Sequence, residues 1–448
     1  MKAPETGEHR GSRALVIGVG RTGVAVARHL RAAGAMVRVT DRRPAGDLRE
    51  ALAALAPPLD AALGCEDPAC LDGVDLVVPS PGVPATAPLL CEAARRGVPI
   101  VSEIELAARA LAIPVLAVTG TNGKSTTTTL LGEMLSAAGR RPFVGGNLGT
   151  PLVEAIGGDH DAAVVEVSSF QLEWVDRFRP VVGVFLNLSE DHLDRYPDID
   201  AYGLTKLRLF ARQIKGDVAV LNGGDHWLRR HAGGLVARQL WFGAGEGAVI
   251  RGDGAAIRLR LLGSEEVYPL AGARIVGAHN RENMMAAIAA ARAFGVPAAA
   301  VQRGLERFPG LEHRLEPVCE RAGVRYVNDS KGTNVGAVVK SLESFAGGVI
   351  LLAGGIDKGG DYGVLVEPVR RAVKRAILFG AAREMLARTL AGATQVEIVN
   401  SLGAAVALAA AVAVPGDTVL LSPACASFDM FRDYADRGRQ FKALVGAL

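Results

Sequence analysis

The sequence predicts an α/β protein of three domains, each with a largely parallel sheet. Its 448 residues correspond to about three domains of ordinary size. Short β-branched runs alternate with alanine-rich helical stretches along the whole chain, as expected for helices packed on parallel strands. Hydrophobic residues make up 49% of the chain and charged residues 22%, which suits packed cores. We expect the domains to span residues 1–103, 104–310 and 311–448.

Composition excludes several classes of partner and site. The formal net charge of +3 is too small to favour nucleic acid or an anionic membrane. The longest apolar run, Leu402 to Val414, is too short to span a bilayer and predicts a buried helix. The cysteines are odd in number, scattered and without CxxC spacing, which argues against disulfides or zinc. We therefore expect a cytoplasmic monomer with small-molecule substrates and no nucleic-acid or membrane partner.

The first domain opens with a strand, a glycine turn and a helix in ALVIGVGRTGVAVARHLRAAGAMVRVTD. The turn has the spacing Gly18-x-Gly20-x-x-Gly23, and Asp41 ends the next strand. This pattern predicts a Rossmann-like domain and leaves an NAD-dependent oxidoreductase open as an interpretation. A further strand, in VDLVVPSPGV, ends in a loop with Ser80 and Gly82.

The second domain begins with a strand, a glycine turn and a helix in VLAVTGTNGKSTTTTLLGEML. Main-chain N–H groups at such a turn bind phosphate, a lysine can reach the β and γ phosphates, and a serine hydroxyl can ligate Mg²⁺. The strict P-loop pattern fails at Val118, where it requires glycine, so only the shorter GxxGKS core remains. We predict a P-loop-type ATPase domain whose nucleotide contacts are Gly120, Thr121, Asn122, Gly123, Lys124, Ser125 and Thr126.

Three further polar residues of this domain have two interpretations each. Glu166 ends the apolar run AAVVEV and is either a ligand of a phosphate-bound Mg²⁺ or a solvated acid. His192 follows another apolar strand and is either functional or merely exposed. Lys206 lies among Leu204, Leu207 and Phe210 in a helical stretch, and this spacing alone predicts a surface lysine.

Segments along nearly the whole chain resemble the Mur ligases. They include TGTNGKSTTT, EVSSFQLE, NLSEDHLDRY, GAHNRENMMAA, GLEHRLE, NDSKGTN and LLSPACASFDMF. The resemblance implies a Rossmann-like C-terminal domain and an ATP-dependent amide ligase of peptidoglycan precursor synthesis. SSFQLE and SPACASFDMF point to the members that add D-glutamate to UDP-N-acetylmuramoyl-L-alanine through an acyl phosphate, with release of ADP and phosphate.

Other functions remain open. A Mur ligase with another amino-acid specificity, for example L-glutamate, would carry most of the same segments. Folylpolyglutamate synthase shares the phosphate turn. A non-catalytic module that only binds ATP would also contain such a turn. An NAD-dependent oxidoreductase would leave the GTNGKS turn and the third domain without a role.

The resemblance also implies roles for individual residues. The catalytic set is Lys124, His192 and Lys206, with Lys206 carbamylated. Two Mg²⁺ ions are expected on Ser125, Glu166, His192 and Lys206. Further ATP contacts are expected from Asn280, Arg314 and Asp329. The UDP substrate is expected on Gly20, Arg21, Thr22, Asp41, Arg42, Ser80, Gly82, Asn147 and His192. D-Glutamate is expected on Thr333, Lys358, Ser427, Phe428 and Tyr434. Arg21 and Tyr434 depart from the family pattern, which has an apolar residue and phenylalanine there.

Overall fold

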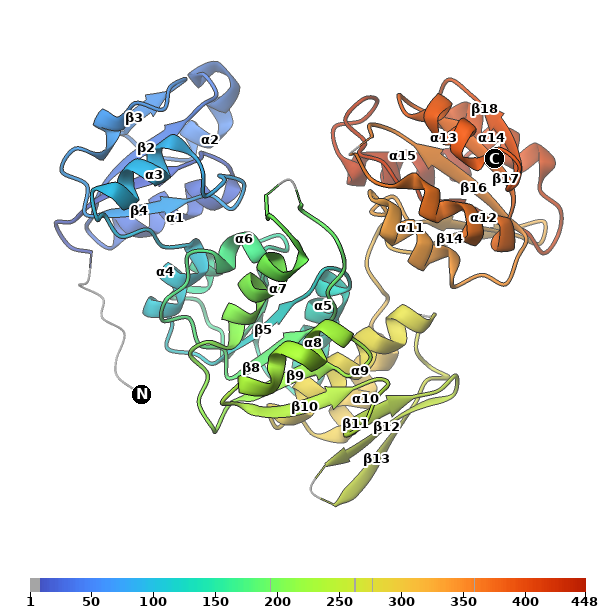
Figure 1. Ribbon diagram of the computed structural model, residues 1–448, viewed down its shortest axis with the longest axis horizontal. Helices are drawn as coiled ribbons and strands as arrows, with labels where there is room; N and C mark the ends of the chain where they lie inside the picture. Colours follow the sequence, from blue (N-terminus) through green and yellow to red (C-terminus); the bar gives the residue numbers. More distant parts are fainter. Residues whose placement is uncertain (1–8, 194, 262, 276, 358) are drawn as a thin grey trace. The chain divides into compact units, whose positions relative to one another are not determined.

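The computed structural model describes residues 9–448 except residues 194, 262, 276 and 358. The chain divides into two compact units. Figure 1 labels their helices and strands. One comprises Met1–Ala273 and Arg281–Phe308, and the other comprises Arg274–Asn280 and Pro309–Leu448. The first unit contains two sheets and the second contains one, so each of the three predicted domains has a sheet of its own.

The N-terminal sheet is parallel and has the order β3-β2-β1-β4. Its strands are β1 (Arg13–Ile17), β2 (Met36–Asp41), β3 (Asp60–Leu63) and β4 (Leu76–Pro79), and α1 (Arg21–Ala32) follows β1. The apolar residues of β1 and β4 are buried, as expected for a sheet covered on both faces. The carboxyl ends of β1, β2 and β4 lie at the same edge, where ligands of open α/β sheets bind.

The central sheet has nine strands in the order β13-β12-β11-β10-β9-β8-β5-β7-β6. The parallel part contains β5 (Val115–Thr119), β6 (Pro142–Gly146), β7 (Ala162–Glu166), β8 (Val182–Phe185), β9 (Val218–Asn222), β10 (Arg238–Phe242) and β11 (Ala248–Gly252). An antiparallel extension, β12 (Ala256–Leu261) and β13 (Ser264–Pro269), was not anticipated from the sequence. Exposed arginines alternate with buried apolar residues in β12, a pattern typical of an antiparallel strand with one solvated face.

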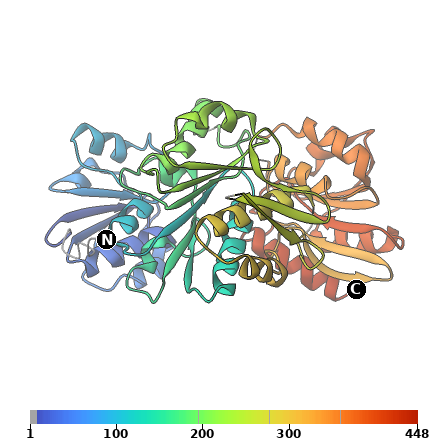
Figure 2. The same ribbon diagram turned by 90° about the horizontal axis from the view of Figure 1, so that it is seen from below.

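Helices cover both faces of the central sheet, as Figure 2 shows. They are α4 (Glu103–Ala110), α5 (Lys124–Ala137), α6 (Ser169–Leu172), α7 (Ile199–Leu207), α8 (His226–His231), α9 (Ala278–Ala293) and α10 (Ala298–Arg307). α5 packs against α10 at Met134 and Gly304. A Cβ atom added at Gly304 would lie 2.8 Å from the Cα atom of Met134. This close contact fixes α5, which begins at the phosphate turn.

The sheet of the second unit has the order β14-β15-β19-β16-β17-β18 and is parallel except for β14. Its strands are β14 (Glu316–Arg321), β15 (Val324–Asn328), β16 (Val349–Gly354), β17 (Val373–Phe379), β18 (Gln395–Ile398) and β19 (Thr418–Leu421). Its helices are α11 (Val335–Leu342), α12 (Val366–Ala372), α13 (Arg383–Leu390), α14 (Leu402–Val412) and α15 (Tyr434–Gly446). Two apolar cores, one on each face, match the predicted Rossmann-like layering.

The prediction that the apolar run from Leu402 is a buried helix is only half right. The helix α14 forms there, but only one face is buried, and Ala404, Ala407 and Ala411 are exposed. Alanine is tolerated at a helix surface because it has the highest helix propensity and little apolar area. No helix among the described residues is both long and apolar enough to cross a bilayer.

Candidate active site

The phosphate turn lies between β5 and α5 in the conformation that its glycines permit. Gly120 has φ 146° and Gly123 has φ 84°, both in the region that favours glycine. A Cβ atom at Gly123 would lie 2.1 Å from Oδ1 of Asn283. The turn thus needs glycine at both positions, and it presents the N-terminus of α5 to an anion.

Asn187, which the sequence analysis missed, holds the turn in place. Its backbone carbonyl accepts a hydrogen bond from the N–H of Thr121 at 2.9 Å. Its side-chain Oδ1 accepts from the N–H of Asn122, also at 2.9 Å. Asn187 follows β8, the strand beside β5, and this position directly after an apolar strand was the available signal.

Two lysine side chains converge on the carbonyl of Gly120. Lys124 Nζ donates to it at 2.9 Å and to the carbonyl of Thr121 at 2.9 Å. Lys206 Nζ, from α7, donates to the same Gly120 carbonyl at 3.1 Å. The two predicted catalytic lysines are therefore adjacent, at the base of the turn.

Lys206 is buried, so the surface position predicted from its spacing is wrong. It is 1% exposed, whereas Leu204 on the same helix is 52% exposed. Burial, with the nearby charge of Lys124 as the next cause, lowers the pKa of Lys206 well below its ordinary value. A lowered pKa favours the neutral amine, which is a nucleophile.

Glu166 joins two other predicted residues through its carboxylate. It accepts a hydrogen bond from Ser125 Oγ at 2.6 Å and another from Asn147 Nδ2 at 2.7 Å. The pairing follows from topology, because β7 lies between β5 and β6 and brings Glu166 beside the residues after both strands. Of the two interpretations of Glu166, the solvated acid is wrong, since its side chain is buried.

His192 lies in an exposed loop after β8 and has a left-handed backbone with φ 57°. Its ring contacts Phe170 edge to face at a centroid distance of 4.7 Å, and its Nε2 is 3.7 Å from the carboxylate of Asp191. The ring of Tyr202, on α7, is 6.0 Å away. The rings of Phe170 and Tyr202 thus lie near His192, and the side chain of Lys206 also lies near the Tyr202 ring, 4.5 Å from its centroid.

The donor set near the turn suits a hard cation. A serine hydroxyl and a buried carboxylate are oxygen ligands of the type that Mg²⁺ prefers, and both lie beside the phosphate turn. No group of three or more His, Cys, Asp or Glu side chains with metal-binding geometry occurs within the described parts of the chain.

The predicted UDP site lies at the carboxyl edge of the N-terminal sheet. Gly20 precedes α1, Arg21 and Thr22 begin it, and Ser80 follows β4 with its hydroxyl donating to the carbonyl of Gly18 at 3.0 Å. Arg21 Nη1 donates to the carbonyl of Gly149, which follows β6 of the central sheet. The structure thus brings Gly20, Arg21, Thr22 and Ser80 to one edge, with Gly82 in the same loop as Ser80.

Asp41 is engaged by the protein itself. Its Oδ2 accepts from the N–H of Val19 and from Arg43, and its Oδ1 accepts from the N–H and Nε of Arg43. The hydrogen bond from Arg43 is the largest cause that lowers the pKa of Asp41, to about 2. These bonds occupy the acceptor positions of the Asp41 carboxylate, so the protein itself fixes this side chain. Arg42 pairs instead with Glu66 at 3.2 Å.

The remaining predicted ATP contacts lie in the second unit. Asp329, after β15, is buried and accepts hydrogen bonds from Ser341 Oγ at 2.7 Å and Ser422 Oγ at 2.6 Å. Burial raises the pKa of Asp329 to about 6. Hydrogen bonds from Ser422 and Ser341, and to a smaller extent the charge of Arg314, oppose this rise. Asn280 is buried near the start of α9.

The predicted amino-acid residues gather at loops of the second sheet. Thr333 follows β15, whereas Ser427 and Phe428 follow the adjacent strand β19. Ser427 is buried, but Phe428 is 70% exposed. Lys358 lies outside the described residues. Lys331, not singled out from the sequence, has its Nζ 3.8 Å from the ring centroid of Tyr434.

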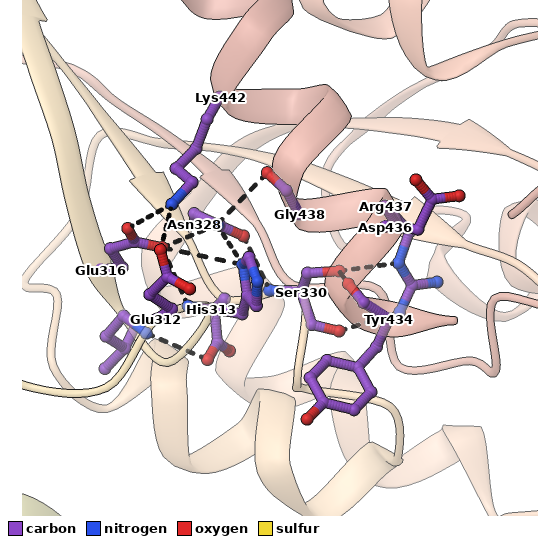
Figure 3. Close-up of polar contacts among 12 residues, drawn as sticks. Glu312, His313, Glu316, Asn328, Ser330, Tyr434, Asp436, Arg437, Gly438 and Lys442 are labelled. Carbon is purple, nitrogen blue, oxygen red and sulfur yellow. Dashed lines mark hydrogen bonds and ion pairs between the residues drawn. The ribbon is translucent and has the colours of Figure 1, made fainter. Parts of the chain in front are cut away.

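A buried polar network fixes Tyr434 at the start of α15, as Figure 3 shows. Ser330 Oγ donates to the Tyr434 carbonyl at 2.7 Å and accepts from Arg437 Nε at 3.0 Å. Arg437, which is fully buried, also donates to the carbonyl of Ser330 at 2.9 Å. The helix α15 and the loop that carries Lys331 and Thr333 are thus held together.

A second part of this network surrounds Asn328. Its amide Nδ2 is 2.8 Å from His313 Nδ1 and 2.9 Å from Glu316 Oε2, and Lys442 pairs with Glu316 (Figure 3). Burial lowers the pKa of His313. The ring of His313 packs directly on Gly438, where an added Cβ would lie 2.2 Å from Nδ1. The segment before β14 is thereby fixed to α15.

Comparisons with known proteins agree with this geometry. Residues 12–102 match the model "Mur ligase MurD-like, N-terminal domain", residues 118–291 match "Mur ligase middle domain", and residues 313–425 match "Mur ligase, glutamate ligase domain". The chain resembles a UDP-N-acetylmuramoylalanine–D-glutamate ligase of Geobacter metallireducens, with 48% identity over 98% of both chains. It resembles the protein of the same name from Anaeromyxobacter dehalogenans, with 47% identity over 99% of both.

Solved structures agree in fold. The UDP-N-acetylmuramate–alanine ligase MurC of Thermotoga maritima has a TM-score of 0.60 and 20% identity, over 97% of this chain and 99% of that one. A pseudomurein peptide ligase type C from Methanothermus fervidus has a TM-score of 0.58 and 18% identity, over 98% and 100%. With three family models matched in order along the sequence and relatives at almost half identity over nearly full length, this chain belongs to the Mur ligase family.

Proposed function

We propose that this protein is an ATP-dependent ligase that joins D-glutamate to UDP-N-acetylmuramoyl-L-alanine in peptidoglycan precursor synthesis. One observation supports the assignment above all others. Relatives named UDP-N-acetylmuramoylalanine–D-glutamate ligase match 97–99% of the chain at 45–48% identity. The proposed domains are residues 1–103 for the UDP substrate, 104–310 for ATP and 311–448 for the amino acid.

The reaction must convert an unreactive carboxylate into an electrophile. The terminal carboxylate of the UDP substrate attacks the γ-phosphate of ATP, which gives an acyl phosphate and ADP. The amine of D-glutamate then attacks the acyl carbon, phosphate leaves, and an amide forms. Two anions approach each other in the first step, so positive charge from Lys124 and from the N–H groups of the turn lowers the barrier.

Ser125 and Glu166 are the proposed ligands of Mg²⁺, supported by their contact at 2.6 Å beside the turn. When bound, Mg²⁺ supplies positive charge that offsets the charge of the phosphates. Asn147 orients the carboxylate of Glu166 through its other oxygen. His192 and Lys206 are the proposed residues of a second cation site, and His192 is also a proposed contact of the UDP substrate.

Carbamylation of Lys206 is part of the proposal. The neutral amine attacks CO₂, a C–N bond forms as one C=O π bond opens, and one proton is released, so the amine becomes a carbamate whose oxygens can ligate a cation. The buried position of Lys206 and its lowered pKa support this reaction, because the ammonium form cannot attack. The remaining contacts are those implied by the family: Asn280, Arg314 and Asp329 for ATP, and Thr333, Lys358, Ser427, Phe428 and Tyr434 for D-glutamate.

One assay tests the function directly. Purified protein is incubated with ATP, Mg²⁺ and UDP-N-acetylmuramoyl-L-alanine whose terminal carboxylate carries ¹⁸O, together with D-glutamate, L-glutamate or another amino acid. We expect ADP, a product with the mass of the D-glutamyl amide, and one ¹⁸O atom in the released phosphate. Turnover with L-glutamate alone would identify a ligase of other specificity, and phosphate without label would exclude the acyl phosphate.

A further inference from the structure

Arg195, which has no role in the proposed reaction, links the central domain to the loop of the UDP site. We propose that Arg195 is a positioning residue that holds the loop of residues 80–83 in the conformation that binds the UDP substrate. The inference rests on the proposed function, since it concerns the same substrate site. Arg195 lies outside that site and acts on it through the loop of residues 80–83.

The guanidinium of Arg195 bonds to the main chain on both sides of Gly82. Its Nη1 donates to the carbonyl of Pro81 at 3.0 Å, and its Nη2 donates to the carbonyl of Val83 at 3.0 Å. Within the loop, the N–H of Val83 donates to the carbonyl of Ser80 at 2.9 Å, which closes a tight turn. Arg195 therefore fixes the orientations of the peptide groups that follow Pro81 and Val83, on either side of the proposed UDP contact Gly82.

Arg195 is itself held rigidly from the central domain. Glu173 accepts from its Nε at 2.9 Å and from its Nη2 at 2.5 Å, and Tyr196 Oη donates to the same carboxylate at 2.6 Å. The guanidinium also lies 4.0 Å from the ring centroid of Phe170. The side chains of Arg195 and Glu173 are only 11% and 12% exposed, so solvent competes little for these bonds.

The geometry requires arginine in particular. One planar group satisfies a carboxylate through two nitrogens, stacks on an aromatic ring and still donates to two carbonyls, which a lysine ammonium cannot do at the same time. The chain of contacts continues from the loop to Ser80, whose hydroxyl donates to Gly18 in the glycine turn of the N-terminal domain. Loss of Arg195 should therefore loosen the loop of residues 80–83 and weaken binding of the UDP substrate. The conformation of the phosphate turn should not change.

The test compares binding and kinetics of Arg195→Lys with those of a matched control. Arg208→Lys alters another arginine that donates to main-chain carbonyls, those of Glu173 and Val175, but has no described contact with residues 80–83. Calorimetric titration gives Kd for UDP-N-acetylmuramoyl-L-alanine and for a non-hydrolysable ATP analogue, and steady-state assays give the KM of each substrate. For Arg195→Lys we expect about a tenfold rise in Kd and KM for the UDP substrate, with values for ATP within twofold of wild type.

A second variant, Glu173→Gln, tests the positioning role in case Arg195→Lys does not fold. Glu173→Gln keeps the size of the anchor but removes its charge, and we expect it to give a smaller rise in Kd for the UDP substrate. An unchanged Kd for this substrate in both variants would overturn the positioning role. An equal rise in the Kd of the UDP substrate and of the ATP analogue would overturn it as well. A wild-type protein that fails to bind the UDP substrate would instead overturn the proposed function.

Discussion

The side-chain nitrogen of Lys206 lies 3.1 Å from the carbonyl oxygen of Gly120, in the interior of the first unit. The same carbonyl accepts a hydrogen bond from Lys124 at 2.9 Å. Two like charges at one acceptor would repel each other, and this repulsion adds to burial in lowering the pKa of Lys206. The arrangement therefore favours the neutral amine of Lys206.

Lys206→Ala should lose nearly all ligase activity, because it removes the proposed oxygen donor of the second cation site. Added acetate or bicarbonate should restore part of the activity by supplying a carboxylate in the space left by the side chain. Protein incubated with ¹³C-bicarbonate should give a carbamate resonance by NMR in the wild type and none in Lys206→Ala. Lys215→Ala, which changes an exposed lysine, is the control and should keep both signal and activity. A wild-type spectrum without the resonance would contradict carbamylation.

Lys124→Ala should reduce kcat by at least about 1,000-fold, because one preorganised charge at the reacting phosphate is worth several kcal/mol in the transition state. Binding of the UDP substrate should change by less than twofold, since its proposed contacts are mainly in the N-terminal domain. Calorimetric titration and ADP release measure the two effects separately. Normal ADP production by the variant would show that Lys124 does not act on the transferred phosphate.

Glu166→Gln should raise the Mg²⁺ concentration needed for half-maximal activity by about tenfold or more, because a neutral amide is a weaker ligand than a carboxylate. Glutamine at position 166 changes the hydrogen bonds that Ser125 and Asn147 donate to this side chain, so the fold must be checked. A melting temperature near that of wild type would show that the variant stays folded. Glu154→Gln, at an exposed position in the segment before β7, is the control. An unchanged Mg²⁺ requirement would remove Glu166 from the metal site.

Much of the first unit follows from local sequence. Glycines at a strand-to-helix transition predict the phosphate turn, and polar residues that end parallel strands meet at one sheet edge, as Glu166 and Asn147 do. The helical spacing alone predicted a surface position for Lys206, and this prediction was wrong. Spacing shows which residues share a helix face but not which face is buried. The packing of α7 buries Lys206 and exposes Leu204, and only tertiary structure determines that choice.

The second unit illustrates a different limit. Its α/β layering follows from the alternation of apolar runs, but the hydrogen bonds of Asn328, Ser330 and Arg437 join segments more than 100 residues apart. No local pattern distinguishes a buried arginine from a surface one. Asn187 and Lys331 were missed for a related reason, since each gains its role from a neighbour that is distant in sequence or on another element.

Tyr434→Phe should keep the KM for D-glutamate within about threefold of wild type, whereas Tyr434→Ala should raise it about tenfold or more. The ammonium of Lys331 lies 3.8 Å from the centroid of the Tyr434 ring, and phenylalanine preserves that ring face. Steady-state kinetics with D-glutamate as the varied substrate measures the effect. Equal losses in the two variants would assign the role to the hydroxyl instead.

Glu103→Gln should change how stability depends on pH. Glu103 is buried at the start of α4, with one oxygen accepting from the N–H of Val153 at 2.7 Å and the other without a hydrogen-bond partner among the described residues. Burial raises its pKa to about 7, so the folded state holds a proton that the unfolded state loses near pH 4.5.

Between these values the folded protein binds more protons than the unfolded chain, and stability therefore falls as pH rises from about 4.5 to about 7. Glutamine remains neutral, so the stability of Glu103→Gln relative to wild type should increase with pH across this window, by at most about 3 kcal/mol. Thermal unfolding of both proteins at pH 5, 6, 7 and 8 measures the trend, with Glu50→Gln as an exposed control. A difference that stays constant with pH would mean that Glu103 is already ionised in the folded protein at pH 5.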